Sequence, residues 1–349
     1  MATEGRTEER GPWARFRHSP FFPATVIVLI AAAAAGLFAG SYTYAMANPT
    51  PHRIPTAVTA DPVSQVKQAD FVQGMEDALD TSLELRRYDS YAAARDAVEE
   101  QRVFAILWPR GDGAALDVSG ASGATVAQLL AETAPKVGAA IKVPVAVTDV
   151  NPLQRGDPRG LALFYITLAA VILGFVGAIQ LNVNARDLNP SERIAFILAL
   201  AALGGFAICA AVDWGLGALR LPFAESWFIL SLTMFTTGMV FTMFNTLFGR
   251  WAMIPTWGLM VILGNPSSGG AVSWPLLPSP LGVIGRWLPP GASVNAQHTA
   301  VYFGRHQHIF PFAVLAAWAA VSTAVFWVWR HRHPGGRELS DRLVDEPRT

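Results

Sequence analysis

Long apolar runs are the feature that most constrains the fold of this chain. A helix needs about twenty apolar residues, at about 1.5 Å per residue, to cross a hydrocarbon core of about 30 Å. Five stretches meet this requirement: 21–46, 161–181, 194–212, 227–248 and 310–329. Since 52% of the 349 residues are hydrophobic and 15% are charged, the chain is too apolar for an ordinary soluble protein of this size. We therefore expect an α-helical polytopic membrane protein.

A sixth apolar segment, 251–263, is too short to cross the bilayer alone, because it spans roughly 20 Å as a helix. It ends at Gly264, which suits the left-handed conformation that closes a helix. Asn265 tolerates the same conformation, and Pro266 cannot continue the hydrogen-bond ladder. We therefore expect the backbone to unwind at membrane depth. Unpaired backbone groups that face lipid are costly, so the unwound segment must be buried in protein or line a wet cavity.

The segment that follows, 264–304, is rich in glycine and proline but also carries large apolar side chains, which an ordinary solvated loop lacks. Two interpretations are open. The segment is either a loop that connects two helices outside the membrane, or a re-entrant outer loop that forms a gate or lines a pathway near the outer surface. We favour the second. Its candidate gate and pathway residues are Gly264, Asn265, Pro266, Ser267, Ser268, Gly269, Gly270, Trp274 and Trp287.

The motifs of this region resemble those of a known family. A Gly-Asn-Pro-Ser-Ser-Gly-Gly element at 264–270 closes the penultimate membrane segment. Trp-Pro follows at 274–275, Trp-Leu-Pro-Pro-Gly-Ala at 287–292 and Tyr-Phe-Gly at 302–304. This pattern, together with the hydropathy layout of the chain, is similar to the permeases of type-2 ABC exporters, especially the branch around the phage-infection proteins. The resemblance implies six membrane segments, an extracytoplasmic domain inserted between the first two, and a homodimer that forms the pathway between its halves.

The resemblance also implies a separate ATPase subunit. The chain itself has no Walker A element, because that phosphate-binding loop requires Gly-Lys-Ser/Thr and none of the three lysines follows a glycine. We expect the ATPase to dock on the cytoplasmic loops 182–192 and 249–251.

Six segments place both termini on one side of the membrane, and the basic residues of the short loops indicate which side. Cytoplasmic loops carry an excess of lysine and arginine, and the loops on the side of the termini hold more arginine than the opposite ones. We therefore expect both termini in the cytoplasm of a bacterial cell, with tails at 1–20 and 332–349, and the protein in the plasma membrane. The arginines on the side of the termini are Arg15, Arg17, Arg186, Arg193, Arg250, Arg330 and Arg332.

Residues 48–160 read as a separate extracytoplasmic α/β domain, with 15 acidic and 11 basic residues. Hydrophobic alternation and helical spacing predict the order βαβαββαβ. Ser90 is expected to cap the second helix, and Pro135 to kink the third. The membrane segments then follow, with the first at 21–47 and the other five within 161–331.

Three further features of the membrane segments are candidates for function. Gly36 and Gly40 form a small-xxx-small pattern that allows another helix to approach closely. Asp213 follows an apolar run and is either an anchor at the membrane interface or a group with a gate or proton-linked role. The first apolar run is either an uncleaved anchor, which we favour, or a signal peptide cleaved near Ala45-Met46-Ala47.

The sequence contains no complete catalytic, cofactor-binding or metal-binding pattern. Ser64 and Lys67 match Ser-x-x-Lys but lack the other motifs of penicillin-recognising enzymes, and His306 and His308 have no cysteine or carboxylate near them in the sequence. The net charge of zero gives no indication of nucleic-acid binding. The resemblance to exporter permeases implies a lipid-embedded permease subunit, and we expect it to export an apolar or amphipathic cargo because the membrane segments carry few charges. The alternative is a membrane scaffold or receptor whose outer domain binds a protein or a phage.

Overall fold

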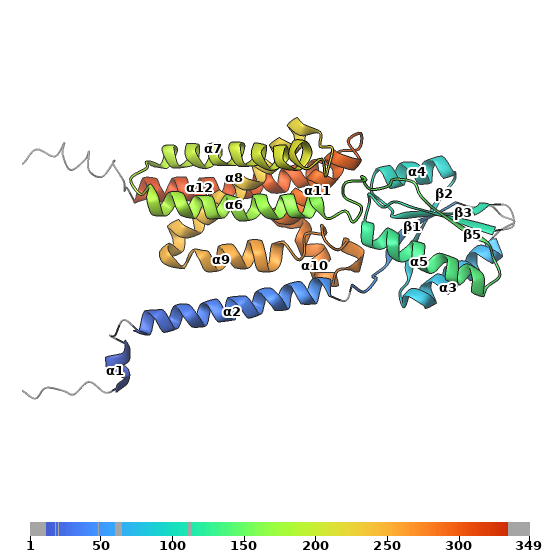
Figure 1. Cartoon of the computed structure of the whole chain (residues 1–349), viewed down its shortest axis with the longest axis horizontal. Helices are drawn as coiled ribbons and strands as arrows, with labels where there is room; N and C mark the ends of the chain where they lie inside the picture. Colours follow the sequence, from blue (N-terminus) through green and yellow to red (C-terminus); the bar gives the residue numbers. More distant parts are fainter. Residues whose placement is uncertain are drawn as a thin grey trace, which may run out of the picture.

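The computed structural model describes residues 12–17, 19, 21–47, 49–59, 65–110 and 113–333. They form an elongated molecule, with long helices at one end and a small α/β domain at the other (Figure 1). Most of the two predicted tails lies outside the described residues, and so does Ser64. Helix α1 (Pro12–Arg17) belongs to the first tail.

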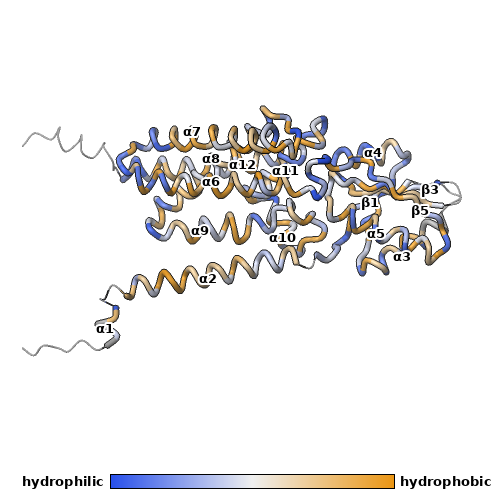
Figure 2. The backbone as a smooth tube through the Cα atoms, viewed as in Figure 1, coloured by the Kyte–Doolittle hydropathy of each residue, from blue (hydrophilic) through white to orange (hydrophobic). Residues whose placement is uncertain are grey.

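Within the described part of the chain, five helices are long and apolar enough to cross a membrane, in agreement with the five long apolar runs. Figure 2 shows their largely hydrophobic course. The five are α2 (Phe21–Met46), α6 (Ala162–Asn184), α7 (Pro190–Ala210), α8 (Phe223–Phe248) and α12 (Ile309–Arg332). Helix α7 continues into a π-helical turn, η1 (Ala211–Gly215). At the start of α7 the carboxylate of Glu192 accepts a hydrogen bond from the backbone N–H of Asn189 at 3.0 Å, as the Asn-Pro-Ser-Glu sequence predicts.

Helix α8 is the most buried of the five, and α6, α7 and α12 pack against it. Glycines set the closest approaches. A Cβ at Gly174 of α6 would lie 2.1 Å from Oγ1 of Thr237, and one at Gly205 of α7 would lie 2.5 Å from Oγ of Ser231. Only a residue without a side chain allows the helices to come this close.

Helix α2 lies along the outside of the bundle (Figure 1). Its described contact with the other membrane helices includes Phe38, whose ring stacks on Trp257 with the ring centroids 6.0 Å apart. No described residue lies within 4 Å of a Cβ built at Gly36 or Gly40. The close helix packing predicted for these two glycines is therefore not found within the described part of the chain.

The short apolar segment forms η2 (Gly249–Trp251), α9 (Met253–Trp257) and the π-helical turn η3 (Gly258–Gly264). As predicted, it is too short to cross a membrane by itself. The left-handed ending predicted at Gly264 is wrong, since the π-helical turn runs through Gly264 and Asn265 follows at φ −68° and ψ −47°. Glycine is required at 264 for another reason: its Cβ would lie 2.7 Å from Cγ of Pro290. The left-handed residue comes later, at Gly269, with φ 80°.

The segment after Gly269 is built from short helices rather than from an extended loop. They are η4 (Trp274–Leu276), α10 (Ser279–Ile284), η5 (Gly285–Trp287) and α11 (Pro289–Tyr302). Helix α11 is largely buried against α6, α8 and α12. This region therefore packs onto the bundle and closes the end that faces the α/β domain.

The α/β domain has the predicted order βαβαββαβ. Strands β2 and β1, β1 and β3, and β4 and β5 pair in parallel, while β3 and β4 form an antiparallel hairpin, which gives the sheet order β2-β1-β3-β4-β5. The elements are β1 (Ile54–Thr59), α3 (Gln65–Leu79), β2 (Leu83–Tyr88), α4 (Tyr91–Glu99), β3 (Ala105–Arg110), β4 (Gly113–Val118), α5 (Ala124–Ala140) and β5 (Val145–Asp149).

Helices cover both faces of this sheet. Along β3, Ala105 and Leu107 belong to the core with α3 and α5, whereas Ile106 belongs to the core with α4. This alternation follows from the two-residue period of a strand. Ser90 caps α4 as predicted, since its Oγ accepts the N–H of Ala93 at 3.1 Å. The predicted domain is thus a three-layer α/β unit.

Candidate functional site

A cavity of about 810 Å³ lies where the α/β domain meets the helix bundle. Its wall combines the domain edge, with Phe104 and Thr125, the segment after Gly264, and helices α11 and α12, with Tyr302 and Phe310. Pockets that bind small molecules have about 300–1,000 Å³ and are mostly apolar with a few polar groups. By its size and lining, this cavity is the candidate functional site.

Hydrogen bonds hold the α/β domain against the segment after Gly264. Oγ1 of Thr125, at the start of α5, accepts the N–H of Ser273 at 3.1 Å and lies 2.9 Å from its Oγ. The N–H of His52 donates to the carbonyl of Pro275 at 2.7 Å. Nε2 of Gln101 donates to Oγ1 of Thr299 at 3.1 Å. These hydrogen bonds hold the α/β domain against the bundle beside the cavity, and we refer to this contact as the joint.

The predicted gate residues divide into two groups. The side facing the cavity is formed by Ser267, Ser268, Gly269, Gly270, Trp274 and Trp287. Behind them, Gly264, Asn265 and Pro266 are buried and do not line the cavity. Six of these nine residues thus line a cavity, and their role as a gate stays a prediction.

Serine hydroxyls satisfy the backbone where the short helix ends. Oγ of Ser267 donates to the carbonyl of Leu263 at 2.6 Å, and Oγ of Ser268 donates to the carbonyl of Asn265 at 2.7 Å. These bonds replace helical ones that the turn can no longer make. The unwound backbone is therefore both hydrogen-bonded and beside a cavity, which is how irregular backbone is tolerated at membrane depth.

Gly270 is tightly enclosed where the segment passes α6 and α11. A Cβ there would lie 3.1 Å from Cβ of Phe164 and 3.1 Å from Cγ2 of Val294. Gly269 has open space around it but adopts a positive φ. A side chain at either position is thus disfavoured, by crowding at Gly270 and by backbone strain at Gly269.

The charged groups of the cavity wall are mostly positive. Among the described residues of the wall, Arg53, Arg159 and Arg286 line it together with one carboxylate, that of Glu84. Burial in the wall lowers the pKa of His298 to about 4, so its imidazole is neutral at physiological pH. The cavity therefore combines aromatic surface with an excess of guanidinium groups, which suits a molecule with an apolar part and a polar or anionic head.

Asp213 lies outside this cavity, in the π-helical turn at the end of α7. Its Oδ2 accepts the N–H of Leu221 at 3.4 Å, so it fastens the loop that leads to α8. That loop is also joined to the linker after the domain: the N–H of Arg220 donates to Oε1 of Gln154 at 2.7 Å, and Nε2 of Gln154 donates to the carbonyl of Arg220 at 3.1 Å. The two roles considered for Asp213, an anchor at the membrane interface and a gate or proton-linked group, both stay predictions.

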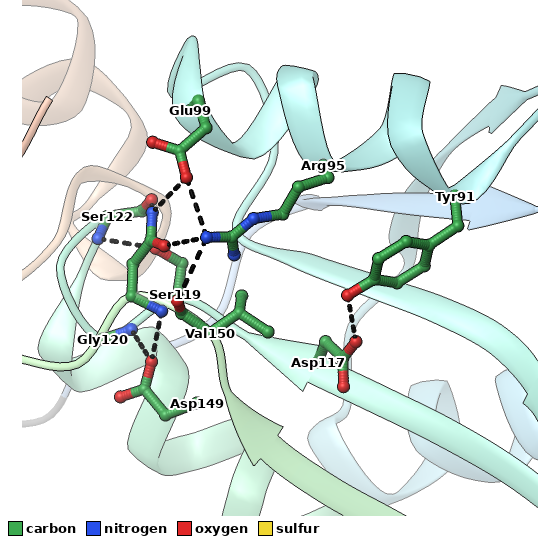
Figure 3. A network of polar contacts seen from close by, with 10 residues as sticks. Tyr91, Arg95, Glu99, Asp117, Ser119, Gly120, Ser122, Asp149 and Val150 are labelled. Carbon is green, nitrogen blue, oxygen red and sulfur yellow. Dashed lines mark hydrogen bonds and ion pairs between the residues drawn. The ribbon is translucent and has the colours of Figure 1, made fainter. Parts of the chain in front are cut away.

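Sequence reasoning missed a polar network that fixes the chain where it leaves the domain (Figure 3). Nη2 of Arg95 donates to the carbonyl of Val150 at 3.1 Å, to Oδ1 of Asn151 at 2.5 Å, and pairs with Glu99 at 2.9 Å. Oδ1 of Asp149 accepts the N–H of Gly120 at 3.0 Å. Arg95 and Glu99 are four residues apart on one helix, and this spacing could have predicted their ion pair. It gives no indication that Arg95 also binds the segment around Val150.

Comparisons with known proteins identify no family: no family model matches the chain, and no match is found among curated proteins or solved structures.

Proposed function

We propose that this chain is the permease subunit of an ABC-type exporter of the type-2 class, which moves an apolar or amphipathic cargo out of a bacterial cell. The observation that carries the proposal is the cavity between the bundle and the α/β domain, whose wall includes residues of the predicted re-entrant loop 264–304. A transporter needs a binding chamber beside a backbone that can rearrange, and this segment lies between helices without being a full membrane span.

The cavity lining supports an amphipathic cargo. Trp274, Trp287 and Phe310 offer apolar surface, while Arg159 and Arg286 offer charge-assisted hydrogen bonds to a polar head. In the proposed protein the α/β domain is extracytoplasmic and caps the exit, with both termini in the cytoplasm. Two copies form the transport unit, and a separate ATPase docks on the loops 182–192 and 249–251.

The first experiment purifies the full chain from its native membrane in mild detergent. Mass spectrometry then identifies the chains that co-purify, and native mass gives the oligomeric state. A stoichiometric ATPase with two copies of this chain is the expected result. A protein that co-purifies with an external partner and with no ATPase overturns the exporter proposal in favour of a scaffold or receptor.

A transport assay tests the gate itself. Cells that express the protein are loaded with a dansyl-labelled fatty acid, and its efflux is followed by fluorescence. Gly270→Val should abolish efflux, because the new side chain crowds Phe164 and Val294. Gly258→Val is the matched control, since a Cβ at Gly258 has no described atom within 4 Å. Equal efflux by the two variants at equal membrane abundance would remove the gate assignment.

A reversible cross-link separates gating from misfolding. The Oγ1 of Thr125 and the Oγ of Ser273 lie 2.9 Å apart, so cysteines at these two positions can form a disulfide between the α/β domain and the re-entrant segment. Cys209 is buried and free, so it does not compete. If the domain moves off the exit during transport, oxidation should stop efflux and a reductant should restore it. Undiminished efflux with the disulfide formed would show that this joint does not open.

A further inference from the structure

A second cavity, of about 360 Å³, lies among the ends of the long helices that face away from the α/β domain. Helices α6, α7, α8 and α12 all contribute to it, and their ends meet at the side of the molecule opposite the domain (Figure 1). It is separate from the chamber described above, and none of its lining residues was singled out as part of the gate.

The wall of this cavity carries several positive charges. Arg186, Arg193 and Arg330 line it, and no aspartate or glutamate does so among the described residues. The ion pairs found in the described part of the chain all lie in the α/β domain and involve none of these arginines. Three guanidinium groups thus converge on one cavity without a described carboxylate to neutralise them.

Arg193 is the innermost of the three, with 9% of its surface exposed. Its Nη1 donates to Oδ1 of Asn182 at 3.0 Å, and its Nη2 donates to the carbonyl of Ala185 at 3.1 Å. Nδ2 of Asn245 donates to the same Asn182 oxygen at 3.1 Å. These acceptors are neutral and orient the guanidinium, and no described carboxylate lines the cavity beside it. Burial of a cation is costly unless an anion is close by.

The surroundings favour a lipid as the source of that anion. The cavity opens among the ends of membrane helices, and its wall includes Trp329, whose ring stacks on His333. Tryptophan is enriched at the level of lipid head groups, and basic pockets between membrane helices bind anionic head groups. Arginine in particular matches phosphate, because its N–H groups donate in pairs.

We infer that this cavity is a binding site for the phosphate of an anionic phospholipid. The Arg186 and Arg330 guanidiniums contact the head group, and Arg193, held by Asn182, supplies the charge at the base of the cavity. The lipid thereby ties together the ends of α6, α7 and α12. This site goes beyond the proposed transport function and does not depend on it.

The test is lipid binding by the purified full-length protein. Native mass spectrometry in detergent counts bound phosphatidylglycerol and, in a parallel titration, bound phosphatidylcholine. Wild type should bind the anionic lipid in preference. Arg186→Gln combined with Arg330→Gln should weaken that binding by about thirtyfold, since each arginine near an anionic surface contributes about fivefold. Arg193 is left unchanged because its hydrogen bonds to Asn182 and to the carbonyl of Ala185 hold the wall of the cavity together.

The matched control is Arg250→Gln. Arg250 lies near the same end of the bundle, with its guanidinium 5.2 Å from the ring centroid of Trp251, and it does not line the cavity. This variant should bind phosphatidylglycerol as wild type does. An equal loss in the control, or no preference of wild type for the anionic lipid, overturns the site.

Two further arms distinguish other anions. Inorganic phosphate that protects wild type against heat at millimolar concentration, and displaces the lipid, would show that the site takes free phosphate and overturns the lipid assignment. The sequence after His333 contains Glu338, Asp341, Asp345 and Glu346. The same segment also contains Arg337, Arg342 and Arg348. If a chain shortened after His333 binds the lipid and the full-length chain does not, the occupant is a carboxylate of this segment and not a lipid.

Discussion

Replacing Thr125 by valine is the most direct test of how the α/β domain is fastened to the membrane part. Valine keeps the branched shape of threonine but has no oxygen. The substitution therefore removes the acceptor for the N–H of Ser273 and the hydrogen bond between the two hydroxyls. Ser273 is 7% exposed, so its N–H has little access to water once the acceptor has gone.

The size of the effect follows from the cost of a buried, unsatisfied donor, about 1–3 kcal/mol. A change of about 1.4 kcal/mol is tenfold in an equilibrium constant, so amide exchange at residue 273 should accelerate by about 5- to 150-fold. Ser273→Ala is the matched control. It removes the hydroxyl but keeps the N–H bonded to Thr125, so it should cost only about 0.5–1.5 kcal/mol.

Hydrogen–deuterium exchange of the detergent-solubilised protein measures the opening at residues 272–275. Thermal unfolding of the same samples reports the total stability. Thr125→Val should expose this segment more than Ser273→Ala, while the amides of the strands in the sheet exchange as in wild type. Equal protection in Thr125→Val and wild type would refute the conclusion that this contact holds the joint closed.

Three other substitutions test separate contacts. Burial and the hydrogen bond to Asp117 raise the pKa of Tyr91 to about 12, whereas a tyrosine in the unfolded chain ionises near pH 10. The folded protein, with Tyr91 neutral, therefore loses stability as the pH rises from about 10 to 12. Tyr91→Phe should remove this part of the alkaline destabilisation, as measured by unfolding midpoints over a series of pH values. Arg95→Met should destabilise the domain by about 1.5–3 kcal/mol, the net contribution of a hydrogen bond to a charged group, because the Arg95–Glu99 pair is part-exposed; circular dichroism melting measures it. Phe38→Ala removes the ring stack with Trp257, worth about 0.5–1.5 kcal/mol beyond its buried area, and should lower the melting temperature with the α/β domain left intact in a proteolysis assay.

The parts of the fold that local physics determines were predictable. Each apolar run of membrane length became a long helix, because in hydrocarbon the backbone must satisfy its own hydrogen bonds. In the α/β domain the strand and helix order followed from side-chain periodicity, and Ser90 caps α4 because a serine side chain accepts the N–H groups that a helix start leaves free.

The candidate site was predictable only as a segment. Thr125 and Ser273, which close the joint, are 148 residues apart in the chain, and no periodicity links them. The error at Gly264 has the same origin. Glycine there was attributed to a local backbone conformation, whereas the nearby ring of Pro290 on α11 is what excludes a side chain. Tertiary contacts of this kind leave no pattern in a single sequence.

The two cavities also bear on where a cargo could pass. Helix α6 reaches the first cavity with Leu163 and the second with Asn182. Between these ends it is pressed against α8, where Gly174 meets Thr237 with no room for a side chain. A path through the middle of one bundle would have to separate this contact. The proposed exporter therefore fits better with a path along the outside of the bundle, between two protomers. Gly174→Ala should impair folding, because the added Cβ would overlap Thr237. A Gly174→Ala protein that folds normally but has lost transport would instead place the path inside one bundle.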